Sequence, residues 1–118
     1  MAALTFNPNA FSELIELEEA GSAGLIDDLI GDYMKTSEVL VRAITDSARS
    51  LDLKLLERSA HSLKSSSRLL GVDALAEVAF RIEEAARAGS IGDDDVRALP
   101  ALLPPGLIEL ARFRDGRK

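Results

Sequence analysis

The sequence has no cysteine, no tryptophan and a single histidine, His61. Without cysteine the chain cannot form disulfides, thiol nucleophiles, zinc ribbons or iron–sulfur clusters, and one histidine cannot build a multi-histidine metal site. Aromatic residues make up only 4% of the chain, and its formal net charge is −6. Because nucleic-acid binding uses stacking aromatics or a basic face for the phosphates, we expect no nucleic-acid partner.

Long apolar runs are also missing. The longest uncharged apolar stretch, residues 99–108, is interrupted by three prolines and is far shorter than a membrane span. Residues 1–10 lack the basic start and the apolar run of a signal peptide. We therefore expect a cytoplasmic protein with no membrane partner, and the length of 118 residues predicts one domain over residues 1–118.

Apolar residues recur at helical spacing nearly everywhere, and no stretch alternates like a strand. This pattern predicts an all-α protein, an up-and-down four-helix bundle with an extra N-terminal helix. Asn9 would cap the first helix, and the long second pattern is one helix or two helices that abut near Thr36–Ser37. Gly71 suits a tight turn, which makes its flanking helices an antiparallel hairpin. The expected helices cover residues 9–19, 26–48, 52–70 and 73–87, followed by a segment that starts at residues 93–95.

The C-terminal segment contains Pro100, Pro104 and Pro105. Each proline removes a helix donor, and proline inside a helix costs about 3 kcal/mol. We therefore expect a proline-interrupted C-terminal helix, with a short piece over residues 94–99, a break near Leu103–Pro105 and a fresh start near Pro105.

His61 points away from the apolar side of its predicted helix. Glu57 is the only acid on the same strip, although the chain as a whole is acidic. Such a strip can simply be a solvated helix face. The concentration of positive charge in an acidic chain, and the serines beside the histidine, which are poor helix formers, favour a functional surface instead. The residues within roughly 60° of His61, at ~100° per residue, are Lys54, Arg58, Lys64, Ser65 and Arg68.

A lone exposed imidazole has few chemical uses. Metal binding lacks partner ligands, and serine hydrolase chemistry would need an oriented acid and an oxyanion hole. A neutral imidazole nitrogen can itself attack a phosphoryl group, and nearby cations would then stabilise the phosphoryl oxygens. The residues alone therefore make His61 a candidate phosphoryl acceptor on a helix.

The run from Ala60 to Gly71, AHSLKSSSRLLG, resembles the phosphoacceptor motif of histidine-containing phosphotransfer (HPt) domains. Two features depart from that family: Ser65 stands where glycine is most common, and the expected break in the last helix is unusual. The likeness covers about residues 25–89 and continues along the next helix at Leu75-Ala76, Ile82-Glu83 and Ala86-Arg87.

By this resemblance His61 would be the phosphorylated residue, Lys64 its nearby cation and Gly71 the hairpin turn. The family relays phosphoryl groups between aspartates of receiver domains in two-component signalling. The implied function is that of a phosphorelay intermediate rather than an enzyme, with response-regulator receiver domains or a hybrid sensor histidine kinase as partners. The receiver would supply the aspartyl phosphate and the Mg²⁺, so we expect this chain to hold no cofactor and no metal.

A docking surface for such a partner is expected around His61. Lys64 and Arg68 should be surface residues that assist transfer rather than folding. Leu69 and Phe80 lie on the wrong side of their helices for the core and would form an apolar centre, unless Phe80 packs under the N-terminal helix. A second hypothesis is a helical adaptor or antagonist that binds a partner through this face without phosphorylation. The expected partner-binding residues are Lys54, Arg58, Ser65, Arg68, Leu69 and Phe80.

Overall fold

The structure describes residues 6–117. The segments with helical apolar spacing form helices in this range. The structure is a computed structural model, and it has no strand in that range, which confirms the all-α prediction. None of the helices within the same range is long and apolar enough to span a membrane. The elements are η1 (Pro8–Phe11, a 3₁₀-helix), α1 (Ser12–Glu19), α2 (Leu25–Arg49), α3 (Leu53–Leu69), α4 (Asp73–Arg87) and α5 (Asp93–Gly116).

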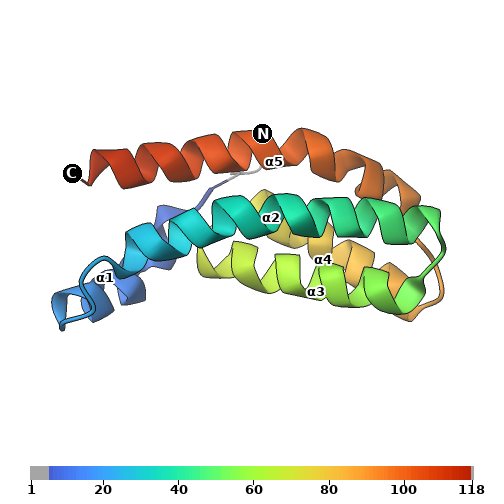
Figure 1. Cartoon of the computed structure of the whole chain (residues 1–118), viewed down its shortest axis with the longest axis horizontal. Helices are drawn as coiled ribbons and strands as arrows, with labels where there is room; N and C mark the ends of the chain where they lie inside the picture. Colours follow the sequence, from blue (N-terminus) through green and yellow to red (C-terminus); the bar gives the residue numbers. More distant parts are fainter. Residues whose placement is uncertain (1–5, 118) are drawn as a thin grey trace.

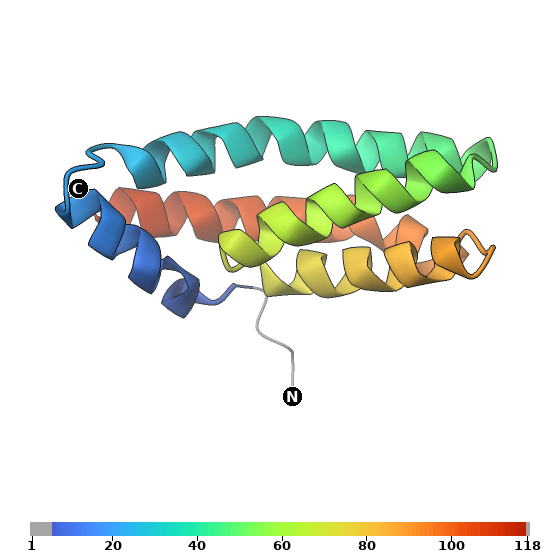
Figure 2. The same cartoon turned by 90° about the horizontal axis from the view of Figure 1, so that it is seen from below.

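The long helices α2, α3, α4 and α5 lie side by side along the long axis of the molecule and alternate in direction (Figures 1 and 2). α2 contacts α3 and α5, and α4 contacts the same two helices. α2 is continuous, so the reading of its pattern as one helix is right. The Asp52 side chain accepts a hydrogen bond from the Leu55 N–H at 3.1 Å, as expected of the residue that caps α3.

Residues near the N-terminus close one end of this bundle. The Asn7 N–H donates a 2.7 Å hydrogen bond to the Gly71 carbonyl in the turn between α3 and α4. Gly71 has a φ of +74°, and a Cβ there would lie 2.2 Å from the Asn7 oxygen, so only glycine fits this turn. The rings of Phe11 and Phe113 stack with their centroids 4.3 Å apart, and Phe6 lies against both.

The start of the first helix differs from the sequence-based expectation. Asn9 is not a cap, because it lies inside η1. The Asn7 side chain instead accepts a 3.1 Å hydrogen bond from the Asn9 N–H, and Pro8 begins the 3₁₀-helix that leads into α1. Proline is suited to this position because the first N–H groups of a helix have no intrahelical partner.

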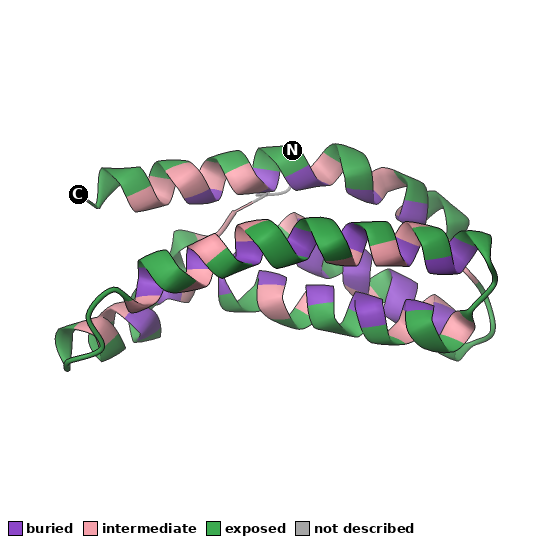
Figure 3. Cartoon of the chain, in the orientation of Figure 1, coloured by how far each residue is buried: buried purple, intermediate pink, exposed green. Residues whose placement is uncertain are grey.

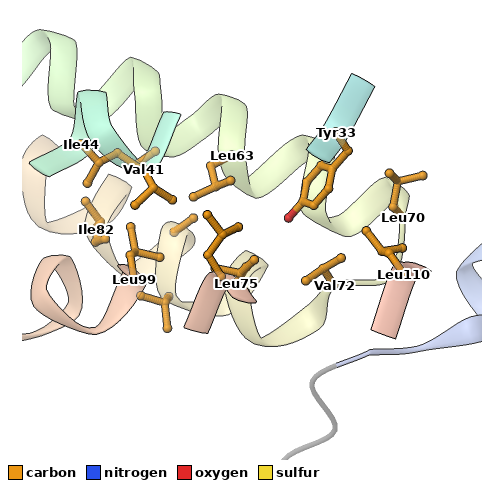
Figure 4. Packing of buried hydrophobic residues seen from close by; sticks show 14 of the residues in the cluster. Tyr33, Val41, Ile44, Leu63, Leu70, Val72, Leu75, Ile82, Leu99 and Leu110 are labelled. Atoms are coloured by element: carbon orange, nitrogen blue, oxygen red, sulfur yellow. The ribbon is translucent and has the colours of Figure 1, made fainter. Parts of the chain in front are cut away.

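The inward faces of the long helices form a continuous buried core (Figure 3). Figure 4 shows side chains from all of these helices meeting along the bundle axis. The phenol of Tyr33 also lies in this core, where its hydroxyl and the Ser67 hydroxyl share a 2.7 Å hydrogen bond. Burial raises the pKa of Tyr33 to about 12, against the smaller opposite effect of that hydrogen bond. The core includes Ile30, Ile44, Leu63, Leu75, Ile82, Leu99 and Leu110.

The predicted break in the C-terminal helix is wrong. α5 runs unbroken from Asp93 to Gly116 with three prolines inside it, and it bends in its first half (Figure 1). All three prolines lie on the exposed side of the helix. The opposite side carries a buried apolar stripe that packs on the bundle, and this packing outweighs the lost hydrogen bonds. The buried residues of that stripe are Val96, Leu99, Leu103, Gly106 and Leu110.

Candidate functional site

His61 lies in the middle of α3 with its side chain 56% exposed. The opposite side of α3 is buried in the bundle through Leu56, Ala60 and Leu63, which turns the imidazole outward. The exposure predicted from the helical wheel is therefore confirmed.

The imidazole contacts a buried carboxylate that was not among the predicted site residues. His61 Nδ1 lies 2.6 Å from Oε2 of Glu83, a residue of α4 with a side chain only 1% exposed. An ionised carboxylate can only accept hydrogen bonds, so Nδ1 carries the proton and donates it. The other ring nitrogen, Nε2, then keeps its lone pair free.

Lys64 is not the surface cation that we expected. Its side chain is only 14% exposed, and its ammonium group donates a 2.6 Å hydrogen bond to Oε1 of Glu83. Burial alone would raise the pKa of Glu83, but the hydrogen bonds from Lys64 and His61 outweigh it and hold that pKa below its usual range. Lys64 therefore belongs to a largely buried ion pair and keeps the carboxylate under His61 ionised.

Arg87 is a further cation at the site. Its guanidinium donates a 3.0 Å hydrogen bond from Nη2 to Glu83 Oε2, the same oxygen that accepts from His61. It also pairs with Glu57 of α3 and with Glu84, each at 3.1 Å. The carboxylates around it, Glu57 first, raise the pKa of Arg87 above its already high value, so the cation is permanent. One guanidinium thus ties α3 to α4 beside the imidazole.

These side chains surround an open hollow next to the imidazole. We call it the His61 hollow. Arg58 lines it and makes no ion pair with any residue in the 6–117 range. The full lining is Glu57, Arg58, His61, Ser62, Glu83 and Arg87.

The other residues predicted to bind a partner lie outside this hollow. Lys54, Ser65 and Arg68 are exposed on α3, and Leu69 is 49% exposed, as expected. Phe80 is only partly buried and does not belong to the buried core. Two cations lie near its ring, with Lys64 Nζ at 5.6 Å and the Arg68 guanidinium carbon at 5.7 Å from the ring centroid.

Glu83 and Arg87 were missed as site residues because their roles depend on how α3 and α4 pair. A signal for Glu83 was nevertheless present. It follows Ala79 and precedes Ala86 at the helical spacing of the apolar side of α4, and a glutamate on such a stripe needs a partner. No comparable pattern marked Arg87, because an arginine near the end of an exposed helix face is ordinary.

The all-helical bundle thus presents an exposed histidine over a buried carboxylate, with cations around it. The chain belongs to the Hpt domain family, whose model matches residues 24–111. The match extends past the expected 25–89 and takes in most of α5.

The fold is also similar to a solved structure of this kind. Histidine-containing phosphotransfer protein B (HptB) from Pseudomonas aeruginosa PAO1 superposes with a TM-score of 0.79 and 22% sequence identity, covering 97% of each chain. None of the curated proteins compared with the chain matches it in sequence. Membership of the Hpt family supports a role in histidine phosphotransfer within a phosphorelay.

Proposed function

We propose that this chain accepts a phosphoryl group on Nε2 of His61 from the aspartyl phosphate of a receiver domain and passes it to another receiver domain. The observation that carries the proposal is the 2.6 Å hydrogen bond between His61 Nδ1 and the buried Glu83. It fixes the tautomer that leaves Nε2 as the nucleophile and orients the ring toward solvent, where a partner can reach it.

The transfer step balances without any proton leaving the ring. The Nε2 lone pair attacks phosphorus, the N–P bond forms, and the P–O bond to the aspartate breaks with its electron pair left on the carboxylate. Nδ1 keeps its proton, so the phosphorylated ring is positively charged beside the Glu83 carboxylate, which stabilises it. Transfer to the next receiver is the reverse of this step.

The cations of the site act on the phosphoryl group from the side of the His61 hollow. Arg58 and Arg87 line that hollow, so their guanidinium groups can bind phosphoryl oxygens through charge-assisted hydrogen bonds. Lys64 acts through Glu83, which it holds ionised. We further propose that the chain is a carrier without turnover of its own, that the receiver supplies Mg²⁺, and that transfer takes place in the cytoplasm.

Phosphoryl transfer to this chain can be tested directly. The purified chain is incubated with phosphoramidate, a small-molecule phosphoryl donor, and separately with a phosphorylated receiver domain. We expect one acid-labile, alkali-stable phosphoryl group, which ³¹P NMR assigns to an imidazole Nε2. His61→Gln should take no label while its helical circular dichroism and melting stay unchanged. Label that persists in His61→Gln would refute the proposal.

The adaptor hypothesis predicts a different result in the same experiment. A helical adaptor would bind the receiver through the α3 surface equally well before and after His61→Gln and would take label from neither donor. Binding without transfer would therefore replace phosphotransfer by this second function.

A further inference from the structure

Arg87 pairs with two acids that play opposite parts at the site. Its Nη2 group reaches Glu83, which is buried under the imidazole, and its Nε group reaches Oε2 of Glu57 at 3.1 Å. Glu57 lies on α3 one helical turn before His61, and its side chain is 37% exposed at the edge of the His61 hollow. The Arg87 guanidinium is therefore already paired with carboxylates at the edge of the His61 hollow.

A phosphoryl group on Nε2 would bring about two negative charges into this hollow. Three of the five guanidinium N–H groups of Arg87 already donate to Glu57, Glu83 and Glu84, so a phosphoryl group would compete with these carboxylates for the cation. The Glu57 carboxylate would also repel the phosphoryl oxygens, since both line the same small space. Both effects favour release of the phosphoryl group over its retention.

We propose that Glu57 is a positioning residue that restrains Arg87 and so limits how firmly His61 holds its phosphoryl group. This inference rests on the proposed function of His61. It gives the carrier a built-in bias toward passing the group on, because one of the two arginines that line the hollow is partly neutralised by an acid of the same chain. Glu84 cannot replace Glu57 in this role, since it pairs with Arg87 but does not line the hollow.

The bias should be visible in two measurable quantities. The first is the lifetime of the phosphohistidine, which ends when water attacks phosphorus, the P–N bond breaks, its electron pair returns to Nε2 and inorganic phosphate leaves. The second is the equilibrium between the phosphorylated chain and a phosphorylated receiver. Glu57→Gln should lengthen the lifetime and shift the equilibrium toward this chain, each by about two- to five-fold, the size of effect that an exposed ion pair produces.

The experiment loads the full chain with phosphoramidate and follows the loss of label by ³¹P NMR. Glu57→Gln is compared with Glu77→Gln, which removes the same charge from an exposed ion pair with Arg81 of α4 that lies outside the hollow. The control should behave like the parent chain. Thermal melting of both variants should match the parent within a degree or two, since exposed pairs contribute little to stability.

The same substitution, made in a chain that lacks the Arg87 guanidinium, tests whether Glu57 acts through Arg87. In an Arg87→Met chain the Glu57→Gln change should have a smaller effect on the phosphohistidine lifetime, because only the direct repulsion between Glu57 and the phosphoryl oxygens remains. If Glu57→Gln has the same lifetime and equilibrium as Glu77→Gln, the inference is wrong although the proposed function stands. If its effect is undiminished in Arg87→Met, Glu57 does not act by restraining Arg87. If the parent chain takes no phosphoryl group on His61, both the inference and the proposed function fail.

Discussion

Glu83 is the residue on which the site depends most. A carboxylate this deeply buried is tolerated only when its charge is matched, and here His61, Lys64 and Arg87 all donate to its two oxygens. The same contacts that keep Glu83 ionised also orient the imidazole. Stability and function therefore share one set of side chains, so substitutions here change both.

This sharing predicts a specific dependence of stability on pH. The pKa of Glu83 is lower in the folded protein than in the unfolded chain, so the ionised carboxylate stabilises the fold above the ordinary glutamate pKa of about 4.3. That contribution is lost as the pH falls through the lower, folded-state value. Glu83→Gln has no such carboxylate. The difference in free energy of unfolding between the parent and Glu83→Gln should therefore shrink from pH 7 to pH 3 in urea denaturation.

Another ionisable residue provides the control for this measurement. Glu77 is exposed on the same helix, and its pair with Arg81 has an N–O distance of 3.4 Å, so Glu77→Gln should give a small difference at every pH. A gap between the parent and Glu83→Gln that stays constant from pH 7 to pH 3 would contradict a structural role for the Glu83 charge.

At the scale of single elements, α5 shows how packing can override local preference. Pro104 lies in the interior of α5 and has no N–H to donate to the carbonyl of Pro100. The helix nevertheless continues, because Leu103 and Gly106 on its other side are buried. A Cβ at Gly106 would lie 2.7 Å from Val72 Cγ1, which shows how closely α5 approaches the start of α4.

The helix should therefore be more stable without its central proline. Pro104→Ala restores an amide donor at an exposed position, and we expect the free energy of unfolding to rise by about 1–3 kcal/mol. Pro8→Ala is the matched control, because Pro8 begins η1 and its missing donor costs nothing there. Chemical denaturation measures both variants. An unchanged or lower stability of Pro104→Ala would show that α5 gains from its proline.

Across the whole molecule, several positive charges gather on one surface although the net charge of the chain is negative. The chain is acidic overall, yet Lys54, Arg58 and Arg68 are all exposed on α3, and Leu69 adds apolar surface at its end. The receiver domain of the mechanism proposed above would bring a negatively charged aspartyl phosphate to this surface. Electrostatic attraction would then guide the encounter, and apolar contact would hold the complex.

The apolar part of this surface can be tested at Leu69. Leu69→Ala should weaken binding to a receiver domain by about 1–2 kcal/mol, a typical loss when an exposed interface anchor is truncated, and leave stability nearly unchanged. Val39→Ala is the control, because Val39 is 66% exposed but lies on α2. Calorimetric titration at low and high salt separates the two contributions. Equal affinity for parent and Leu69→Ala would place the interface elsewhere.

Local sequence patterns were enough to predict the helical class, the position of most helices and the outward direction of His61. These features follow from the 3.6-residue periodicity and from local signals such as Asp52 and Gly71, which act within a few residues along the chain. The exposure of Leu69 followed from the same reasoning.

The surroundings of the imidazole and the continuity of α5 depend instead on contacts between helices. Glu83 reaches His61 across the α3–α4 interface. Lys64 donates to the same carboxylate, which lies 19 residues away in sequence. The continuity of α5 is likewise set by the bundle it packs on, against the local preference of its prolines. The site and the continuity of α5 both depend on contacts between segments that are distant in sequence. The apolar periodicity of a single segment gives no information about such contacts.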